Sequence, residues 1–387
     1  MTEQSLFKLI DYIESRNYRG YDPYDALKSP LFHLPLLRSN KLLRFGAQQF
    51  VKRFPLNLRP LLAVPGGYNP VTLGLCIQGY SFQIPDSNPQ EAEQITKEED
   101  LVKIRFLIEE LKKLIPQGFH GACWGYDFPW EARHVTIAAY QPTVVATGII
   151  SNALFECYRL TGLESARDLC ISAGAFVLND LNRTTEGDTF CFSYSPFDRQ
   201  QVYNASMKGA RLLAQVYSLT GDEQAGIAAR LAVRYVLNHQ NSDGSWFYSN
   251  AAGGGRIDNY HTGYVLDCLD EYRICSGDQS VSGAIEKGYI FYKDSFIEPD
   301  GRPKFYHSRW WPVDSTAAAQ AILTLCRFGD LQLAEKVAAW MIGHMQSPAG
   351  YFYYRKNRFT TQRTSFMRWS NAWMMAALSR LVSDLAI

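Results

Sequence analysis

A polar loop that runs directly into an apolar helix occurs six times along this chain, and the repeat limits its possible folds more than any other feature. The clearest copy is Arg256 to Glu271, where a polar and aromatic stretch precedes apolar residues at helical spacing. The six copies are marked by Pro70, Pro142, Tyr203, Tyr260, Pro312 and Trp369, which lie 72, 61, 57, 52 and 57 residues apart in turn. A period of this size predicts a closed or stacked array of one supersecondary unit.

Two classes of helix alternate within the repeat. The first helix of each pair is apolar nearly all round and rich in small residues, as suits a helix packed on every side, whereas the second has one apolar stripe and one charged face. The helices expected to be inner cover 71–82, 143–160, 204–219, 262–274, 314–326 and 371–382. The helices expected to be outer cover 97–115, 164–181, 222–240, 281–296 and 331–345, and an amphipathic helix at 3–16 is available as the sixth.

This inventory resembles the six-hairpin α/α toroid, so we predict an all-α (α/α)6 fold with an inner and an outer ring and almost no strand. Residues 1–68 are expected to be a helical extension that contributes an outer helix and includes a further helix near 40–53. Residues 69–387 are expected to form the toroid domain. Turns from inner to outer helices are short and end in glycine, whereas the return loops are long and carry aromatic and charged residues. Long loops on one rim of a rigid scaffold are where function is expected.

Composition excludes several classes of function. Apolar residues make up 47% of the 387 residues, enough for a large core, and 39 basic residues balance 38 acidic ones, so charge gives no case for a nucleic acid partner. No apolar run is long enough to span a membrane. The N-terminus lacks the apolar segment of a signal peptide, which indicates a cytoplasmic protein. The eight cysteines include no C-x-x-C pair, and no nucleotide-binding loop is visible, so neither a metal nor a cofactor is expected.

Carboxylates on separate loops of the functional rim are candidates for acid–base chemistry. Asp127 lies among aromatic residues, which favour a protonated carboxyl group and suit a proton donor, whereas Asp258 lies near Arg256 and His261 and suits a base. Two such groups converging on one pocket are what glycoside hydrolysis needs. Asp314 begins an inner helix before Ser and Thr, so a catalytic role and an N-cap role are both open for it.

Tyr260 and His261 support a second chemistry on the same rim. They could act as acid and base in the abstraction of a proton next to a carboxylate, the step that polysaccharide lyases and uronate epimerases share. The alternative is that both residues fix the loop by hydrogen bonds at the helix entrance.

Arginine and aromatic residues concentrate on the long loops. Planar guanidinium groups pair with carboxylates or phosphates, which favours an anionic glycan as the partner, and aromatic faces stack on sugar rings or plug helix ends. The arginines are Arg133, Arg199, Arg256, Arg309, Arg355, Arg363 and Arg368. The other residues expected to bind substrate are Trp124, Tyr126, Trp130, Tyr194, Asn204, Trp246, His307, Trp311, Tyr353 and Trp369.

Two resemblances extend this interpretation. The turn Gln240-x-x-x-Gly244-x-Trp246, repeated at Gln346 as Q-x-x-x-G-x-F, resembles the turn motif of triterpene cyclases and related toroids, and we interpret it as a fold signature. The combination of C-W-G-Y-D-F, C-F-S-Y-S-P, D-N-Y-H-T-G-Y and the W-P step at Trp311 is similar to a bacterial family found with surface-polysaccharide genes. Some members carry the label delta-aminolevulinic acid dehydratase, but that enzyme is a β/α barrel and this chain shows no alternation of strands and helices.

We therefore expect an enzyme that acts on an acidic, uronate-containing saccharide, by hydrolase-like acid–base chemistry or, alternatively, as a lyase or C5-epimerase. Six-hairpin toroids host many such enzymes, an argument by analogy of fold. A terpenoid-cyclase-like enzyme is disfavoured because the rim is polar and lacks a D-x-D-D motif. A non-catalytic glycan-binding protein of polysaccharide assembly remains an alternative, and the sequence leaves the oligomeric state open.

Overall fold

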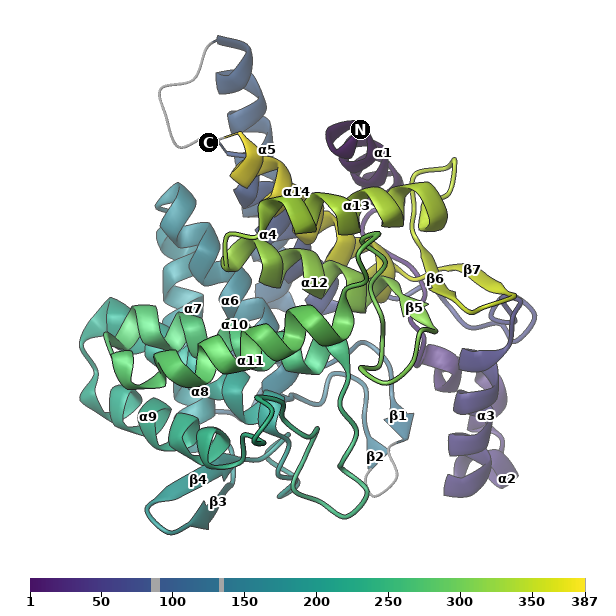
Figure 1. The fold of residues 1–387 in the computed structure, drawn as a ribbon. Helices are drawn as coiled ribbons and strands as arrows, with labels where there is room; N and C mark the ends of the chain where they lie inside the picture. Colours follow the sequence, from purple (N-terminus) through teal and green to yellow (C-terminus); the bar gives the residue numbers. More distant parts are fainter. Residues whose placement is uncertain (85–90, 132–135, 387) are drawn as a thin grey trace.

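Six apolar helices form a closed inner ring in the computed structural model, which describes residues 1–84, 91–131 and 136–386 (Figure 1). They are α4 (Pro70–Phe82), α6 (Val144–Thr161), α8 (Tyr203–Thr220), α10 (Asn259–Ser276), α12 (Ser315–Arg327) and α14 (Trp373–Leu385). Each packs against the next, and α14 packs against α4, which closes the ring. Every residue of α4 is buried, as the absence of a polar face predicts.

The outer ring consists of amphipathic helices that each follow an inner helix. They are α5 (Glu91–Lys113), α7 (Glu164–Asn179), α9 (Glu223–Asn238), α11 (Ser282–Phe296) and α13 (Leu331–Met345). The predicted all-α toroid with inner and outer rings is therefore confirmed. Glycine in the left-handed region ends α6, α8 and α10, and at α8 the N–H of Gly221 (φ 72°) donates to the carbonyl of Tyr217.

The N-terminal helix α1 (Thr2–Ser15) packs against α13 and α14. The side-chain amide of Gln240, at the end of α9, donates to the carbonyl of Ala284 in α11 at 3.0 Å. The equivalent Gln346, at the end of α13, donates to the carbonyl of Ser5 in α1 at 3.0 Å. Because Gln346 joins α13 to α1 in the way that Gln240 joins α9 to α11, α1 takes the position of the sixth outer helix. The division of the chain at residue 68 stays a prediction.

Short elements gather at the rim where the outer-to-inner loops lie. They are η1 (Asp25–Lys28), η2 (Pro30–His33), α2 (Pro35–Arg38), α3 (Lys41–Arg53) and the π-helical turn η4 (Met367–Ala372), whereas η3 (Gln279–Val281) lies in the turn from α10 to α11 at the other rim. The strands are β1 (Trp130–Glu131), β2 (Thr136–Ile137), β3 (Arg183–Glu186), β4 (Thr189–Phe192), β5 (Val313–Asp314), β6 (Tyr353–Lys356) and β7 (Thr361–Ser365). They pair antiparallel as β1–β2, β3–β4 and β5–β6–β7. Figure 1 shows α2 and α3 beside this rim, and α3 packs against β1.

None of the helices in the described residues is both long enough and apolar enough to cross a membrane.

Candidate active site

A cavity of about 340 Å³ opens at this rim of the inner ring. Its walls come from α3, from the loops that lead into α6, α8 and α10, and from α6, α8, α10, α12, η4 and α14. The lining residues are Tyr24, Phe45, Gln48, Gln49, Tyr126, Phe128, Trp130, Glu131, Val145, Ile149, Tyr194, Gln200, Asn204, Tyr248, Arg256, Tyr260, His261, Tyr264, Thr316, Arg368, Trp369 and Trp373. Its volume and its aromatic walls with a few polar groups are typical of small-molecule sites.

His261 and Asp258 form a pair at the wall of this cavity. Asp258 is the N-cap of α10, and its Oδ1 accepts a hydrogen bond from the backbone N–H of His261 at 3.2 Å. Its Oδ2 lies 2.8 Å from His261 Nδ1, so the carboxylate fixes the imidazole orientation and leaves Nε2 as the proton acceptor. The sequence predicts that this helix begins at Thr262, which is wrong: it begins at Asn259, and the Asp258 carboxylate caps its first turn by accepting from the N–H of His261.

The surroundings of the pair favour a neutral imidazole beside a charged carboxylate. Burial alone would raise the pKa of Asp258, but His261 and Arg256 outweigh it and hold that pKa below the usual value. Burial lowers the pKa of His261 below 6.5, against the opposing effect of Asp258. At neutral pH His261 can therefore accept a proton, and Asp258 can stabilise the imidazolium that results.

Aromatic side chains surround the imidazole. The centre of the Tyr260 ring lies 4.0 Å from the centre of the His261 ring. The Tyr248 ring packs edge-on against His261, with 4.7 Å between the ring centres. Burial raises the pKa of Tyr260 well above 10, so its phenol stays protonated and can donate a proton or a hydrogen bond. Trp369, whose Nε1 donates to Asp314, packs edge-on against Tyr260 at 5.8 Å.

A second cavity of about 480 Å³ adjoins the first and shares Tyr24, Gln49, Arg256 and Tyr260 with it. Basic side chains dominate its charged lining: Lys52, Arg53, Arg256 and Arg355, against the single carboxylate of Asp258. This excess of positive charge favours an anionic group in the second cavity.

Asp127 does not converge with Asp258 on these cavities, contrary to expectation. Its Oδ2 lies 2.9 Å from the ammonium of Lys28, and its Oδ1 accepts a hydrogen bond from the amide of Asn69 at 2.7 Å. It faces a separate cavity of about 10 Å³. The aromatic neighbours in its sequence predict a proton donor, but tertiary contacts with Lys28 and Asn69 occupy one oxygen each.

Asp314 also lines neither of the two cavities. One oxygen accepts from the backbone N–H of Thr316, which makes Asp314 the N-cap of α12, and from the Trp369 indole. The other accepts two hydrogen bonds from Arg355, at 2.7 and 3.0 Å. Of the two roles left open for Asp314, these contacts fit the N-cap.

The predicted substrate-binding residues fall into three sets within the described part of the chain. Tyr126, Trp130, Tyr194, Asn204, Arg256, Arg368 and Trp369 line the first cavity. Trp124 and Trp246 are buried plugs whose indole N–H groups donate to the carbonyls of Leu111 and Val236. The residues that line neither cavity and lie at or near the surface are Arg199, His307, Arg309, Trp311, Tyr353 and Arg363. Arg133 lies outside the described residues.

Sequence reasoning missed the contribution of the N-terminal segment. Tyr24, Gln48, Gln49 and Lys52 line the cavities although they precede the first repeat, and nothing in their pattern points to a site. Tyr248 and Tyr264 were also missed. Tyr248 could have been predicted from the sequence, because it follows the Q-x-x-x-G-x-W turn by two residues and lies in an outer-to-inner loop rich in polar and aromatic residues.

Arg368 is held at the junction between the cavity and the N-terminal segment. Its Nε lies 2.7 Å from Asp22 and its guanidinium stacks over the ring of Tyr126. Within residues 1–84, 91–131 and 136–386, no three His, Cys, Asp or Glu side chains are grouped as metal ligands.

Several solved structures share this fold, although no family model and no curated protein matches the chain. A cellobiose 2-epimerase from Bacillus thermoamylovorans is similar with a TM-score of 0.61 at 12% identity, over 81% of this chain and 87% of that one. An unsaturated glucuronyl hydrolase specific for heparin also gives 0.61, at 13% identity, over 100% of this chain and 97% of that one. A polysaccharide lyase gives 0.53 at 11% identity, over 82% and 91%.

At these identities the similarity establishes the architecture, the (α/α)6 toroid seen in carbohydrate-active enzymes. The label delta-aminolevulinic acid dehydratase gains no support, because the described strands form short antiparallel pairs and not a β/α barrel. The resemblance to the surface-polysaccharide family stays a hypothesis.

Proposed function

We propose that the chain is a carbohydrate-active enzyme for an acidic saccharide, with His261 as its acid–base group and Asp258 as the residue that orients it. The observation that carries this proposal is the 2.8 Å contact between Asp258 Oδ2 and His261 Nδ1 at the wall of the 340 Å³ cavity. The aromatic walls suit sugar rings, and solved structures with this fold include a glucuronyl hydrolase, an epimerase and a lyase.

The preference for an acidic sugar rests on the basic side chains of the second cavity. Arg256 lines both cavities. A uronate carboxylate in the first cavity, and another on the neighbouring sugar in the second, would therefore each lie near a cation. With the reacting sugar beside His261 in the first cavity, the second cavity would hold the neighbouring sugar.

Among the chemistries, proton abstraction fits the groups better than hydrolysis by two carboxylates. Glu131 is the carboxylate that lines the first cavity within the described residues, and its two oxygens are engaged by Arg44 at 2.7 Å and Thr136 at 2.6 Å. A neutral imidazole facing the cavity suits removal of a proton from a carbon next to a carboxylate or carbonyl, as in epimerisation or β-elimination. Tyr260 lines the same wall, which suits donation of a proton to the leaving oxygen of a β-elimination, whereas epimerisation would need a donor on the opposite wall.

Nuclear magnetic resonance in D₂O tests the function and separates the chemistries. The purified protein is incubated with saturated and unsaturated uronic-acid disaccharides and with cellobiose. With the saturated disaccharides, deuterium at a sugar carbon signals proton abstraction, a new double bond signals elimination, and a free reducing end without either signals hydrolysis. With the unsaturated disaccharides, loss of the double bond with deuterium at one of its carbons signals hydration that leads to hydrolysis. Turnover of the acidic sugars that is lost in His261→Ala supports the proposal. Full activity of that variant, or turnover of cellobiose alone, contradicts it.

A further inference from the structure

A small cavity of about 50 Å³ lies inside the inner ring, next to the floor of the candidate active site. The two cavities share Ile149, Tyr264 and Trp373. The inner cavity is too small for a sugar, but it exceeds the roughly 10–15 Å³ that one water-sized probe needs. Its charged lining consists of Lys208, Arg211, Arg327, Arg380, Glu156 and Asp267.

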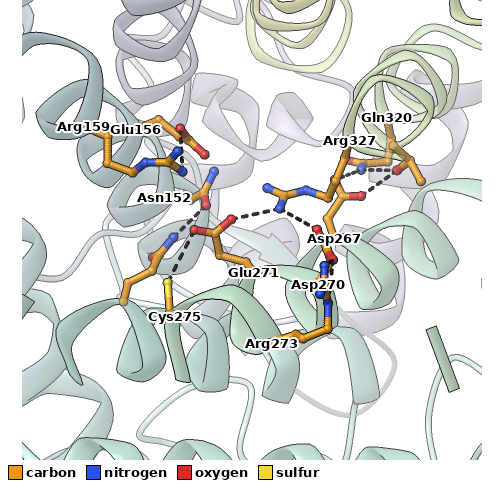
Figure 2. A network of polar contacts seen from close by, with 12 residues as sticks. Asn152, Glu156, Arg159, Asp267, Asp270, Glu271, Arg273, Cys275, Gln320 and Arg327 are labelled. Atoms are coloured by element: carbon orange, nitrogen blue, oxygen red, sulfur yellow. Dashed lines mark hydrogen bonds and ion pairs between the residues drawn. The ribbon is translucent and has the colours of Figure 1, made fainter. Parts of the chain in front are cut away.

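Most charges around this cavity already have partners. Arg327 contacts Glu271 at 2.9 Å and Asp270 at 3.2 Å, and Figure 2 shows these contacts within one network. Asp267 accepts hydrogen bonds from Gln320 and Thr324 at 2.6 and 2.8 Å.

Arg380 and Glu156, which also line the cavity, each have a partner of opposite charge. Arg380 is bound by Asp384 at 2.7 and 2.8 Å, and Glu156 lies 3.7 Å from Arg159. Burial, together with the nearby Glu271, raises the pKa of Glu156, and burial raises the pKa of Asp267, so these two carboxyl groups oppose an anion less than two full charges would.

Lys208 and Arg211 differ from these groups. They lie one turn apart on α8 with only 2% and 5% of their surface exposed, and neither has a carboxylate within 4.0 Å in the described part of the chain. Arg211 donates from Nη2 to the carbonyl of Gly148 at 2.7 Å, but its buried Nε has no hydrogen-bond partner among the described residues. The ammonium of Lys208 lies 3.5 Å from the centre of the Tyr264 ring.

A buried cation without a contacting carboxylate is costly. Burial lowers the pKa of Lys208 to about 7. The guanidinium of Arg211, in contrast, cannot lose its proton and has only the more distant Asp267 and Glu271 to oppose its charge. An anion in the cavity would give Arg211 a counter-charge in contact and would favour the protonated form of Lys208. The amide side chains of Gln78 and Asn152 also line the cavity and add potential donors.

We propose that the cavity inside the ring is a binding site for a small inorganic anion of the size of chloride, held by Lys208 and Arg211. The anion neutralises the guanidinium of Arg211 and favours the charged form of Lys208 next to the floor of the active-site cavity, and it holds α8 to its neighbours in the ring. This inference does not depend on the proposed reaction, because it concerns a separate cavity and a ligand that is not a sugar.

Crystals soaked in sodium bromide test the site directly, because bromide replaces chloride and scatters anomalously. The expected result is an anomalous peak between the Lys208 ammonium and the Arg211 guanidinium. Bromide peaks on the surface with none inside the ring overturn the proposal.

Thermal unfolding at constant ionic strength gives an independent measurement. Gluconate, which is too large for the cavity, is replaced stepwise by chloride, and a saturable rise in Tm of about 3 °C is expected at a hundredfold excess over Kd. Lys208→Gln and Arg211→Gln should remove this rise, whereas Arg230→Gln, which deletes an exposed arginine of α9, should keep it. An equal response in all four proteins, or none in the unmodified chain, overturns the proposal. If the two inner variants do not fold, the bromide experiment on the unmodified chain decides.

Discussion

Asp258 and Asp314 occupy equivalent positions in the repeat, since each caps the inner helix that follows it. They differ in what the second carboxylate oxygen contacts. In Asp314 that oxygen is bound by Arg355 at 2.7 Å, whereas in Asp258 it holds the imidazole of His261 at 2.8 Å. The same capping chemistry therefore leaves one carboxylate structural and makes the other part of the candidate site.

Asp258→Asn separates the capping role of this residue from its effect on His261. Asparagine caps a helix about as well as aspartate, so Tm should change little, but the loss of the carboxylate beside Nδ1 should lower kcat by roughly 10²–10⁴. Steady-state kinetics on the identified substrate and calorimetric unfolding check the two halves of this prediction.

Asp127→Asn is the matched control, because it makes the same change in a carboxylate outside both cavities. Here the ion pair with Lys28 is lost, so stability should fall by about 1.5–3 kcal/mol while kcat stays within a few-fold of the unmodified chain. If Asp127→Asn abolishes turnover and Asp258→Asn does not, the assignment of the site is wrong.

The pH dependence of the rate should report His261 directly. A base acts when deprotonated, so kcat/KM should fall as the pH drops through the lowered pKa of His261, below 6.5, and should be level above it. Asp258 raises this pKa against the larger effect of burial, so Asp258→Asn should move the fall to a lower pH. Measuring the profile in both proteins is the check, and a fall centred above pH 7 would speak against His261 as the base.

At the scale of the elements, the turn that ends an outer helix joins that helix to the next one. In the copy at Gln346, the side-chain amide donates to the carbonyl of Gly350 and to that of Ser5 in α1. Gly350 has a φ of 97°, and a Cβ there would lie 2.2 Å from the carbonyl oxygen of Lys8. The glycine is thus needed both for the turn and for the close approach of α1.

Gly350→Ala should lower the free energy of unfolding by about 1–3 kcal/mol, because alanine is strained at this φ and collides with backbone. The matched control is Gly343→Ala within α13, where a Cβ would meet nothing within 4 Å. That change should leave stability equal or raise it by up to about 1 kcal/mol, as expected in a helix. Denaturant unfolding of the two variants measures the contrast, and equal effects would contradict it.

At the scale of the whole molecule, the first helix of the chain closes the outer ring beside the last inner helix (Figure 1). Leu6, Leu9, Ile10 and Ile13 form its buried face. Segments near a chain end often contribute little to stability. Here α1 covers α13 and α14, so its buried face belongs to the main core.

Leu9→Ala should therefore cost about 2–5 kcal/mol, as in the middle of a core, because Leu9 is fully buried. Phe7→Ala on the same helix is the control: Phe7 is 60% exposed and its loss should change stability by less than about 0.5 kcal/mol. Urea unfolding followed by tryptophan fluorescence and by circular dichroism measures both variants. A Leu9→Ala protein as stable as the unmodified chain would show that α1 is loosely attached.

The sequence by itself determined the architecture, because hydrophobic periodicity, glycine turns and the repeat are local properties that each helix carries within its own residues. It also pointed to His261, Tyr260 and Arg256, since they lie close together in the sequence at the start of α10. In contrast, the partners of Asp127 and the lining from Tyr24 and α3 depend on residues far apart in the chain. Asp127 and Lys28 are 99 positions apart, and no local pattern encodes such a contact.

Contacts between residues far apart in the chain also decide which charges are buried inside the ring. From the sequence alone, Lys208 and Arg211 would be expected on a solvent-exposed face of a helix, and their spacing does not indicate that both are buried. Only the closure of six helices around one axis decides which polar side chains point inward, and whether a carboxylate from another helix comes close enough to pair with them. Periodicity fixes which face of a helix is apolar, but the contacts between helices decide what each buried charge meets.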